Sequence, residues 1–368
     1  MSAKTIGRVV LDDTDQKLLN LIQTEFPLTG RPFAALGERV GESEQAVMDR
    51  YQRLKDDRVI RQVSAIFDTR KLGYRSSLVA TSAPEERVDE AADVISSHPG
   101  VSHNYRRNHE FNIWWTIAVP PHQDLQTHVN ALHRLCGGTS TRILPTLKLY
   151  KIGVDLDVSD TRSMDAQSTL PAHKETARTA QDLTPDEVVF VRELQDDLAL
   201  EPTPFASMAE RIGTSERAVL EAAQAFIDEG LMRRYAAVLH HRRAGFGANG
   251  MSVWRAPEER TDEYGYLLAG YAAVSHCYRR PTYPDWPYAL FGMIHGTSKE
   301  RVEEAIQSIR ERSGLDDYRI LYSTKEYKKV RVRYFDPAYD EWAATNILPQ
   351  DRHQDVEATE PFSPESTD

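Results

Sequence analysis

The two halves of the 368-residue sequence repeat one another, and this duplication constrains the fold more than any other feature. Equivalent residues lie 172 positions apart at the start of the repeat, 173 apart near its middle and 177 apart at its end. Examples are Leu11 and Leu183, Phe33 and Phe205, Gly41 and Gly213, Val47 and Val219, His103 and His276, Arg142 and Arg319, and Tyr150 and Tyr327. The extra residues of the second copy include a proline-rich stretch at 281–287. A duplicated sequence predicts a duplicated series of structural elements.

Each copy begins with a pattern that is typical of a winged helix-turn-helix domain. In the first copy, apolar periodicity predicts helices over residues 13–25, 32–40 and 43–56, followed by a wing over 60–67. Gly41 suits the tight turn before the third helix, and Ser43 suits the N-cap of that helix.

The rest of each copy predicts a ferredoxin-like unit. In the first copy, strands over 74–82, 101–107, 112–119 and 141–152 and helices over 85–98 and 123–135 follow the order βαββαβ. The predicted fold class is therefore α+β, a tandem duplication of a winged helix-turn-helix domain followed by a ferredoxin-like domain. We expect helix-turn-helix domains at 1–62 and 183–234, ferredoxin-like domains at 63–157 and 235–337, a linker at 158–182 and a disordered tail at 338–368.

Composition limits the class of protein. The chain is 40% hydrophobic and 27% charged, and no apolar run approaches the roughly 20 residues of a membrane span or resembles a secretory signal. The presence of only two cysteines, Cys136 and Cys277, favours a reducing compartment. A formal net charge of −11 opposes nonspecific binding to duplex DNA. We therefore expect a cytoplasmic protein without a membrane partner and without DNA as its main partner.

One cluster of polar side chains occurs in both copies. His103-Asn-Tyr-Arg-Arg107 returns as His276-Cys-Tyr-Arg-Arg280. Alternation along a strand would place the histidine, the tyrosine and the second arginine on one face, and the first arginine on the other. Such a face combines a proton donor, a phenol and a clamp for carboxylates. A single histidine or arginine pair on a strand is more often structural, but duplication of the whole cluster favours a functional site.

The domain order resembles that of the Lrp/AsnC transcription regulators, and residues 11–19 are similar to the opening of that family. The repeated cluster is instead similar to the siroheme decarboxylases, which share this Lrp/AsnC-type architecture but act as enzymes. The similar stretches are 103–114 and 276–288, and they resemble the two different subunits of that enzyme, fused head to tail. The resemblance covers about residues 11–157 and 183–336.

This resemblance implies a carboxy-lyase that removes CO2 from two acetate side chains of siroheme. The product would be 12,18-didecarboxysiroheme, for haem d1 synthesis or for the alternative haem route. Siroheme is flat, polyanionic and already contains iron, so the resemblance implies neither a further cofactor nor a metal site of the protein's own.

The site residues follow from the repeated cluster and from the aligned last strands. We expect His103 and His276 to donate protons with the help of Tyr105 and Tyr278. Carboxylates would bind Arg106, Arg107, Arg279, Arg280, Lys148, Lys151, Lys325 and Lys328, and the walls would include Trp114, Trp286 and Tyr288. Either histidine could instead ligate the substrate iron, and the sequence leaves both roles open. His109 is a weaker candidate. Trp286 and Tyr288 slightly favour the second copy for tetrapyrrole binding, because they would add bulk at the mouth of its pocket.

Two other functions remain as alternatives, a regulator of the Lrp/AsnC type and a haem-binding sensor without catalysis. The predicted recognition helices argue against the regulator, because 43–55 is only weakly basic and 215–229 carries four acidic residues against one arginine. Only turnover would distinguish the sensor from the enzyme. We expect the two α+β units to pair as an internal pseudo-dimer, with a higher homo-oligomer or a paralogous partner chain left open.

Overall fold

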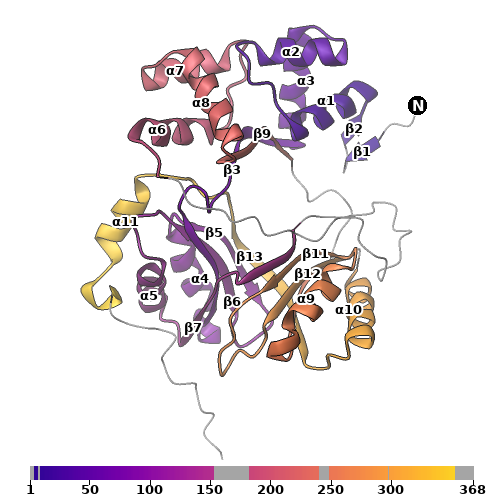
Figure 1. The fold of residues 1–368 in the computed structure, drawn as a ribbon, viewed down its shortest axis with the longest axis vertical. Coiled ribbons are helices and arrows are strands. Elements are labelled where there is room, and N and C mark those ends of the chain that lie inside the picture. The colour runs from indigo at the N-terminus through magenta and orange to yellow at the C-terminus, as the bar shows by residue number, and fades with distance from the viewer. Residues whose placement is uncertain (1–3, 7–8, 153–181, 240–247, 297, 353–368) are drawn as a thin grey trace, which may run out of the picture. The chain divides into compact units, whose positions relative to one another are not determined.

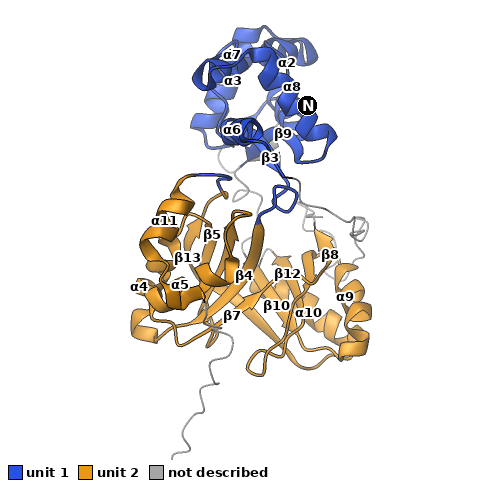
Figure 2. Cartoon of the chain, turned by 60° about the vertical axis from the view of Figure 1, so that its left-hand side comes forward, with its two compact units in different colours: residues 1–74, 178–244, 333–336 blue, residues 75–177, 245–332, 337–368 orange. Residues whose placement is uncertain are grey.

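A computed structural model describes residues 4–6, 9–152, 182–239, 248–296 and 298–352 (Figure 1). The chain divides into two compact units, one of residues 1–74, 178–244 and 333–336 and one of residues 75–177, 245–332 and 337–368 (Figure 2). Both helix-turn-helix copies therefore belong to one unit, and both α+β copies belong to the other. The boundaries expected after residues 62 and 234 are displaced, because they fall inside strands β3 (Ile60–Phe67) and β9 (Met232–Leu239) of the first unit.

The first unit contains two copies of a three-helix arrangement. The first copy comprises α1 (Asp13–Thr24), α2 (Pro32–Val40) and α3 (Glu44–Asp56), preceded by a short hairpin of β1 (Lys4–Ile6) and β2 (Val9–Leu11). The second comprises α6 (Pro185–Leu194), α7 (Pro204–Ile212) and α8 (Glu216–Asp228). The predicted turn and cap are confirmed. Gly41 has a left-handed φ of 78°, which favours glycine, and the Ser43 side chain accepts a hydrogen bond from the backbone N–H of Ala46.

The wings of the two copies pair with each other. β3 and β9 form an antiparallel two-stranded sheet in which Val63 lies opposite Ala237. Aromatic side chains of both copies pack beside it, with the Tyr235 ring 6.1 Å from Phe26 and 5.7 Å from Phe205. Because an isolated two-stranded ribbon is only marginally stable, this common core is needed to hold the pair of wings.

The second unit contains the two predicted α+β copies. The first comprises β4 (Arg75–Ser82), the 3-10 turn η1 (Glu85–Arg87), α4 (Val88–Ser97), β5 (Val101–Arg107), β6 (Ile113–Val119), α5 (Leu125–Cys136), β7 (Ser140–Leu144) and β8 (Lys148–Ile152). The second comprises β10 (Ala248–Trp254), η3 (Glu258–Arg260), α9 (Thr261–Ala269), β11 (Val274–Arg279), β12 (Leu290–Gly296), α10 (Lys299–Ser313) and β13 (Tyr318–Lys329). The βαββαβ order is confirmed.

The two copies exchange their last strands. The nine strands follow the order β7-β4-β6-β5-β13-β10-β12-β11-β8, so β8 of the first copy pairs with β11 of the second. In return, β13 pairs with β10 through its first half and with β5 through its second half. The single strand expected over 141–152 is therefore wrong. It is divided at Pro145, which has no N–H to donate, whereas the equivalent Tyr322 donates its N–H to Asn108 Oδ1 and β13 continues.

Three buried clusters hold this unit together. Neighbouring tryptophans of β6 face opposite ways, because Trp115 belongs to a cluster shared with α4 and α5 and Trp114 belongs to one shared between the two copies. The shared cluster contains Ala80, Phe111, Trp114 and Leu144 of the first copy and Met251, Val253, Trp286, Tyr288, Phe291 and Leu321 of the second. The third cluster lies under α9 and α10. The internal pseudo-dimer thus has both exchanged strands and a common core.

The C-terminal segment is ordered as far as residue 352, so the disorder expected over 338–368 is wrong for that part. Helix α11 (Ala338–Asn346) and the 3-10 turn η4 (Pro349–Arg352) follow β13, and Tyr339 and Asp351 are buried. Arg134 of α5 donates two hydrogen bonds of 3.0 and 2.8 Å to the Asp351 carboxylate. Residues 353–368, and the expected linker apart from Asp182, lie outside the described residues. Among the described helices, none is long and apolar enough to span a bilayer.

Candidate functional site

Strands β5 and β11 place the predicted histidine, tyrosine and second arginine in a row. The His103 and Tyr105 rings are 6.2 Å apart, and the Arg107 guanidinium lies 5.8 Å from the Tyr105 ring. In the second copy, the His276 and Tyr278 rings are also 6.2 Å apart, and Arg280 lies 4.8 Å from Tyr278. The predicted alternation is therefore confirmed in both copies.

The residues between the histidine and the tyrosine face the helices. Asn104 donates a 2.9 Å hydrogen bond to the Ala92 carbonyl of α4, and the Cys277 thiol lies 3.5 Å from the Gly265 carbonyl of α9. Burial raises the pKa of Cys277 to about 12, so it stays a thiol at neutral pH. Cys277 therefore has a packing role.

The second arginine of each cluster contacts a strand of the other copy, just before the exchanged segment of that copy. Arg107 donates a 2.7 Å hydrogen bond to the carbonyl of Leu321 in β13, and Arg280 donates to the carbonyl of Leu144 in β7. Both side chains are buried. Burial lowers the pKa of Arg107 to about 10, so it is still a cation at neutral pH, and its Nε has no hydrogen-bond partner among the described residues. A buried cation with an unfilled N–H is suited to receive a carboxylate.

The first arginine of each cluster is already neutralised on the helix side. Arg106 forms an ion pair with Glu85, which precedes α4. Arg279 forms an ion pair with Glu258, the equivalent residue before α9, and lies 3.7 Å from Asp262. A partner within the chain weakens the case for these two guanidiniums as the main substrate clamps.

The four predicted lysines also have partners within the chain. Lys148 lies 2.6 Å from Asp262, and Lys325 lies 3.0 Å from the equivalent Asp89. Two further lysines cap the C-terminal ends of helices, since Lys151 donates to the carbonyl of Tyr271 and Lys328 donates to the carbonyls of Ser96 and His98. These contacts give each lysine a structural role, and substrate binding by them stays a prediction.

The predicted aromatic walls lie in the shared core. Trp114, Trp286 and Tyr288 are buried, with the Trp286 ring centroid 5.1 Å from each of the other two rings. Trp286 comes from the long loop of the second copy, which is anchored to the first copy by a two-bond contact of Arg142 with Asp285 at 2.9 and 2.7 Å. The expectation that Trp286 adds bulk at the mouth of the second pocket is therefore wrong.

A cavity of about 420 Å³ opens at the end of β5. Its lining includes Arg106, Arg107 and Lys325, together with His109 and Glu85. Burial lowers the pKa of His109, whose Nδ1 accepts a 3.0 Å hydrogen bond from the Phe111 amide. Because Arg106 pairs with Glu85 and Lys325 pairs with Asp89, Arg107 is the cation of this lining that is best placed to receive an anionic group.

The two histidines have different hydrogen-bond partners. His103 Nδ1 lies 3.0 Å from Ser102 Oγ, which lies 2.8 Å from Thr116 Oγ1. In the second copy, His276 Nδ1 lies 2.7 Å from Ser275 Oγ, and that oxygen lies 2.7 Å from His295 Nε2.

Sequence reasoning missed His295 and both serines. The serine before each histidine is visible in the repeat, and this signal could have drawn attention to it. His295 has no such signal, because Ala118 stands at the equivalent position of the first copy.

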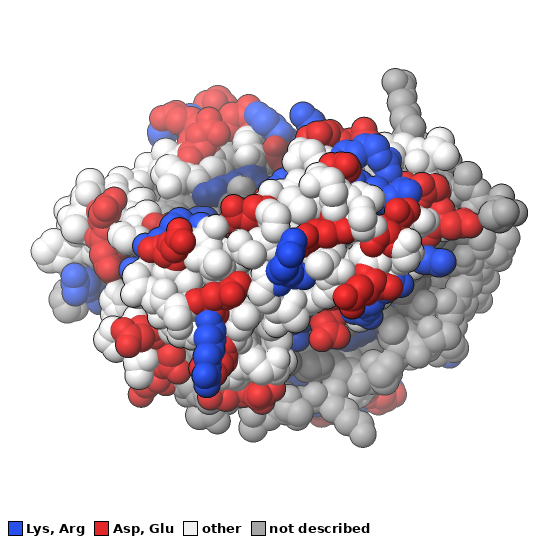
Figure 3. Space-filling view, turned by 90° about the horizontal axis from the view of Figure 1, so that it is seen from above, with Lys and Arg blue, Asp and Glu red and all other residues white. Residues whose placement is uncertain are grey.

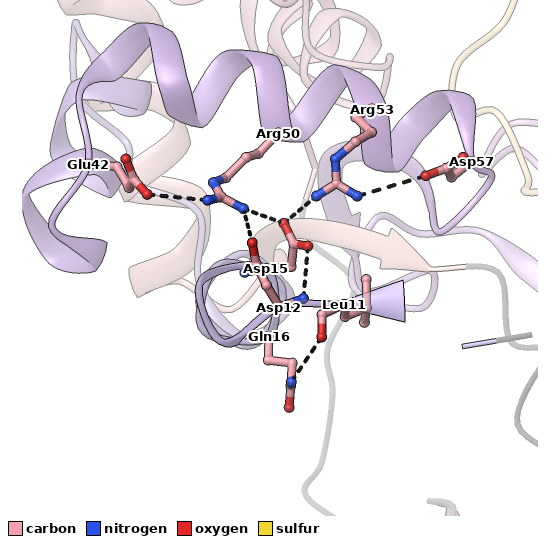
Figure 4. Close-up of polar contacts among 8 residues, drawn as sticks. All are labelled: Leu11, Asp12, Asp15, Gln16, Glu42, Arg50, Arg53 and Asp57. Atoms are coloured by element: carbon pink, nitrogen blue, oxygen red, sulfur yellow. Dashed lines mark hydrogen bonds and ion pairs between the residues drawn. The ribbon is translucent and has the colours of Figure 1, made fainter. Parts of the chain in front are cut away.

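The arginines of helices α3 and α8 form ion pairs within the helix-turn-helix unit, and Figure 4 shows those of α3. Arg50 of α3 lies 2.7 Å from Asp12 and 3.0 Å from Asp15, and Arg53 lies 2.5 Å from Asp15. On α8, Arg217 pairs with Glu221 at 2.7 Å. In the view of Figure 3, acidic and basic side chains are interspersed without a continuous basic area. Phosphate binding needs available cations, so these contacts argue against DNA as the main partner.

Comparisons with known proteins agree with this geometry. The model of the AsnC-like ligand binding domain matches residues 71–151 and 243–328, and that of the siroheme decarboxylase NirDL-like HTH domain matches 15–61 and 190–233. A protein named siroheme decarboxylase from Hydrogenobacter thermophilus is 38% identical over 331 residues, covering 89% of this chain and 96% of that protein.

Two further comparisons concern the ligand and the duplication. The crystal structure of the siroheme decarboxylase NirDL in co-complex with an iron-uroporphyrin III analogue superposes with a TM-score of 0.74 at 32% identity, covering 91% of this chain and 99% of that one. The siroheme decarboxylase alpha subunit of Desulfovibrio desulfuricans is 41% identical over 145 residues, which are 39% of this chain and 83% of that subunit. Similarity over nearly the full length of both chains, together with the repeated His-Tyr-Arg row, shows that the chain belongs to the siroheme decarboxylase family.

Proposed function

We propose that this chain decarboxylates two acetate side chains of siroheme and releases 12,18-didecarboxysiroheme, a step in haem d1 or alternative haem synthesis. The observation that carries the proposal is the duplicated row of His103, Tyr105 and Arg107 in a chain similar to named siroheme decarboxylases. The second row, of His276, Tyr278 and Arg280, supplies the same types of side chain.

The reaction needs a cation for the acetate, a place for the developing negative charge, and a proton. In each step the bond between the methylene and the carboxylate carbon breaks, CO2 leaves, and the electron pair stays on the methylene carbon. The conjugated macrocycle of the substrate spreads that charge, and one proton then completes the methyl group. The step needs no oxidant or reductant.

The residues of the row have complementary tasks in this scheme. Arg107 and Arg280 would hold the substrate carboxylates, since a buried guanidinium keeps its charge and can bind a carboxylate through two N–H groups. A histidine would deliver the proton, with the neighbouring tyrosine as hydrogen-bond partner. No resident cofactor is required, because the iron enters with the substrate.

The test is anaerobic incubation of the purified chain with siroheme, with product masses read by chromatography and mass spectrometry. Successive loss of one and two CO2 units is the expected result. Binding without a mass change would refute the stand-alone decarboxylase and would favour a sensor or a requirement for a paralogous partner chain. Gel filtration of the active sample would determine whether a higher homo-oligomer forms.

A further inference from the structure

The second copy contains a chain of four polar groups that the first copy lacks. It runs from Asn249 Oδ1 to His295 Nδ1 at 2.6 Å, from His295 Nε2 to Ser275 Oγ at 2.7 Å, and from Ser275 Oγ to His276 Nδ1 at 2.7 Å. Asn249 and His295 are cross-strand partners on β10 and β12, so the sheet register fixes the start of the chain.

With a neutral His295, one arrangement of donors satisfies all three contacts of this chain. An amide oxygen can only accept, so His295 carries its proton on Nδ1 and presents the lone pair of Nε2 to Ser275. The single Ser275 hydroxyl proton is then donated to His295, so Ser275 accepts from His276 Nδ1. The longer 3.4 Å contact from Ser275 to the Met293 carbonyl is the weaker alternative.

The same position in the first copy has no fixed direction. Ala118 replaces His295, and its cross-strand partner is Ser76 in place of Asn249. Ser102 instead contacts the Thr116 hydroxyl, and two hydroxyls can exchange the roles of donor and acceptor. The Ser102 contact therefore does not by itself fix the tautomer of His103, whereas His276 is held with its proton on Nδ1.

We propose that His276 ligates the substrate iron through Nε2, and that Ser275 and His295 are positioning residues that hold it in the required tautomer. Metal-ligating imidazoles typically donate their other N–H to an oxygen that fixes the ring, and Ser275 Oγ fills that place. A neutral histidine protonated on Nδ1 has no proton on Nε2 to donate, so proton delivery belongs to His103. This inference rests on the proposed function for the identity of the ligand and assigns the two roles that the sequence leaves open.

The first experiment reads the tautomer without any substrate. Nitrogen-15 NMR of ring-labelled histidines is expected to show His276 protonated on Nδ1 in the full chain. The H295A variant should lose this preference, and H295Q should retain it because its amide oxygen can accept from Ser275. A His276 ring protonated on Nε2 in the unaltered chain would overturn the proposal.

The second experiment reads the iron. Absorption and electron paramagnetic resonance spectra of the chain with siroheme are expected to show a histidine-ligated iron, which H276A loses and H103A retains. S275A should weaken siroheme binding by roughly 10- to 100-fold, the usual cost of losing a partner of a metal ligand, whereas the matched S102A should not. Equal effects of the two serine variants, or an unchanged H276A spectrum, would refute iron ligation by His276.

Failure of this proposal can be distinguished from failure of the proposed function. Histidine ligation without CO2 loss would refute the decarboxylase alone. CO2 loss with an H276A spectrum identical to that of the unaltered chain would refute only the ligand assignment. Absence of siroheme binding would refute both.

Discussion

Replacement of Arg107 should weaken tetrapyrrole binding far more than replacement of its neighbour Arg106. Arg107 is buried in the His-Tyr-Arg row and has an unfilled Nε, whereas Arg106 is neutralised by Glu85. A hydrogen bond between charged groups contributes about 1.5–3 kcal/mol, which corresponds to a roughly 10- to 150-fold increase in Kd for R107M. R106M should change Kd by less than about threefold, because an ion pair with this exposure contributes little.

The assay is an anaerobic absorbance titration with siroheme, accompanied by a denaturant titration of each variant. R107M also removes the donor to the buried Leu321 carbonyl, which should lower the free energy of unfolding by about 1–3 kcal/mol. R107K keeps the charge but loses the planar fork, so its Kd should fall between those of the unaltered chain and R107M. An R106M variant that binds as weakly as R107M, at equal stability, would refute the assignment of Arg107 as the clamp.

Three further substitutions test the packing of the α+β unit. W286A should lower the free energy of unfolding by about 3–5 kcal/mol, because it leaves a cavity in the core shared by both copies. Denaturant titration measures this loss, and a loss below about 1 kcal/mol would contradict the shared core. R134M leaves the buried Asp351 carboxylate without its main partner and should destabilise the C-terminal segment by roughly 3–5 kcal/mol. Faster hydrogen exchange over α11 is the expected result, and unchanged exchange would contradict a stabilising role of this ion pair. Burial lowers the pKa of His128 to about 4, below its usual 6.5, so the unfolded chain binds more protons and stability should fall as the pH falls from 6.5 to 4. H128Q should flatten this slope by on the order of 1 kcal/mol per pH unit, and an unchanged slope would contradict a neutral buried His128.

Local features were predictable from the sequence, and contacts between distant segments were not. The repeat predicted the order of elements, Gly41 and Ser43 predicted a turn and a cap, and strand alternation predicted the row of His103, Tyr105 and Arg107. These depend on neighbours within a few residues. Strand exchange and the ordered structure of residues 338–352 depend on strand pairing with, and burial against, distant segments. The periodicity of a sequence carries no information about such contacts.

The predicted lysines show the same limit at the level of the site. Their positive charge was evident, but the partners of Lys148 and Lys325, Asp262 and Asp89, come from helices more than 100 residues away in the sequence. A basic residue on an aligned strand therefore predicts a charge, and the fold decides whether substrate or a carboxylate of the chain neutralises it. His295 was not predicted as a site residue, because the prediction relied on residues that occur in both copies and His295 occurs in one copy only.

Some contacts of the repeated cluster occur in both copies, and others occur in one copy only. Arg107 with Leu321 and Arg280 with Leu144 are equivalent contacts, and each joins the cluster of one copy to a strand of the other copy. Their loss in either half would weaken the pseudo-dimer, so both halves have to keep them. The surroundings of the two histidines are not constrained in this way, because Thr116 and His295 each act within their own copy. Duplication with strand exchange thus leaves the framework symmetric, while each histidine has its own hydrogen-bond partners and can acquire its own chemistry.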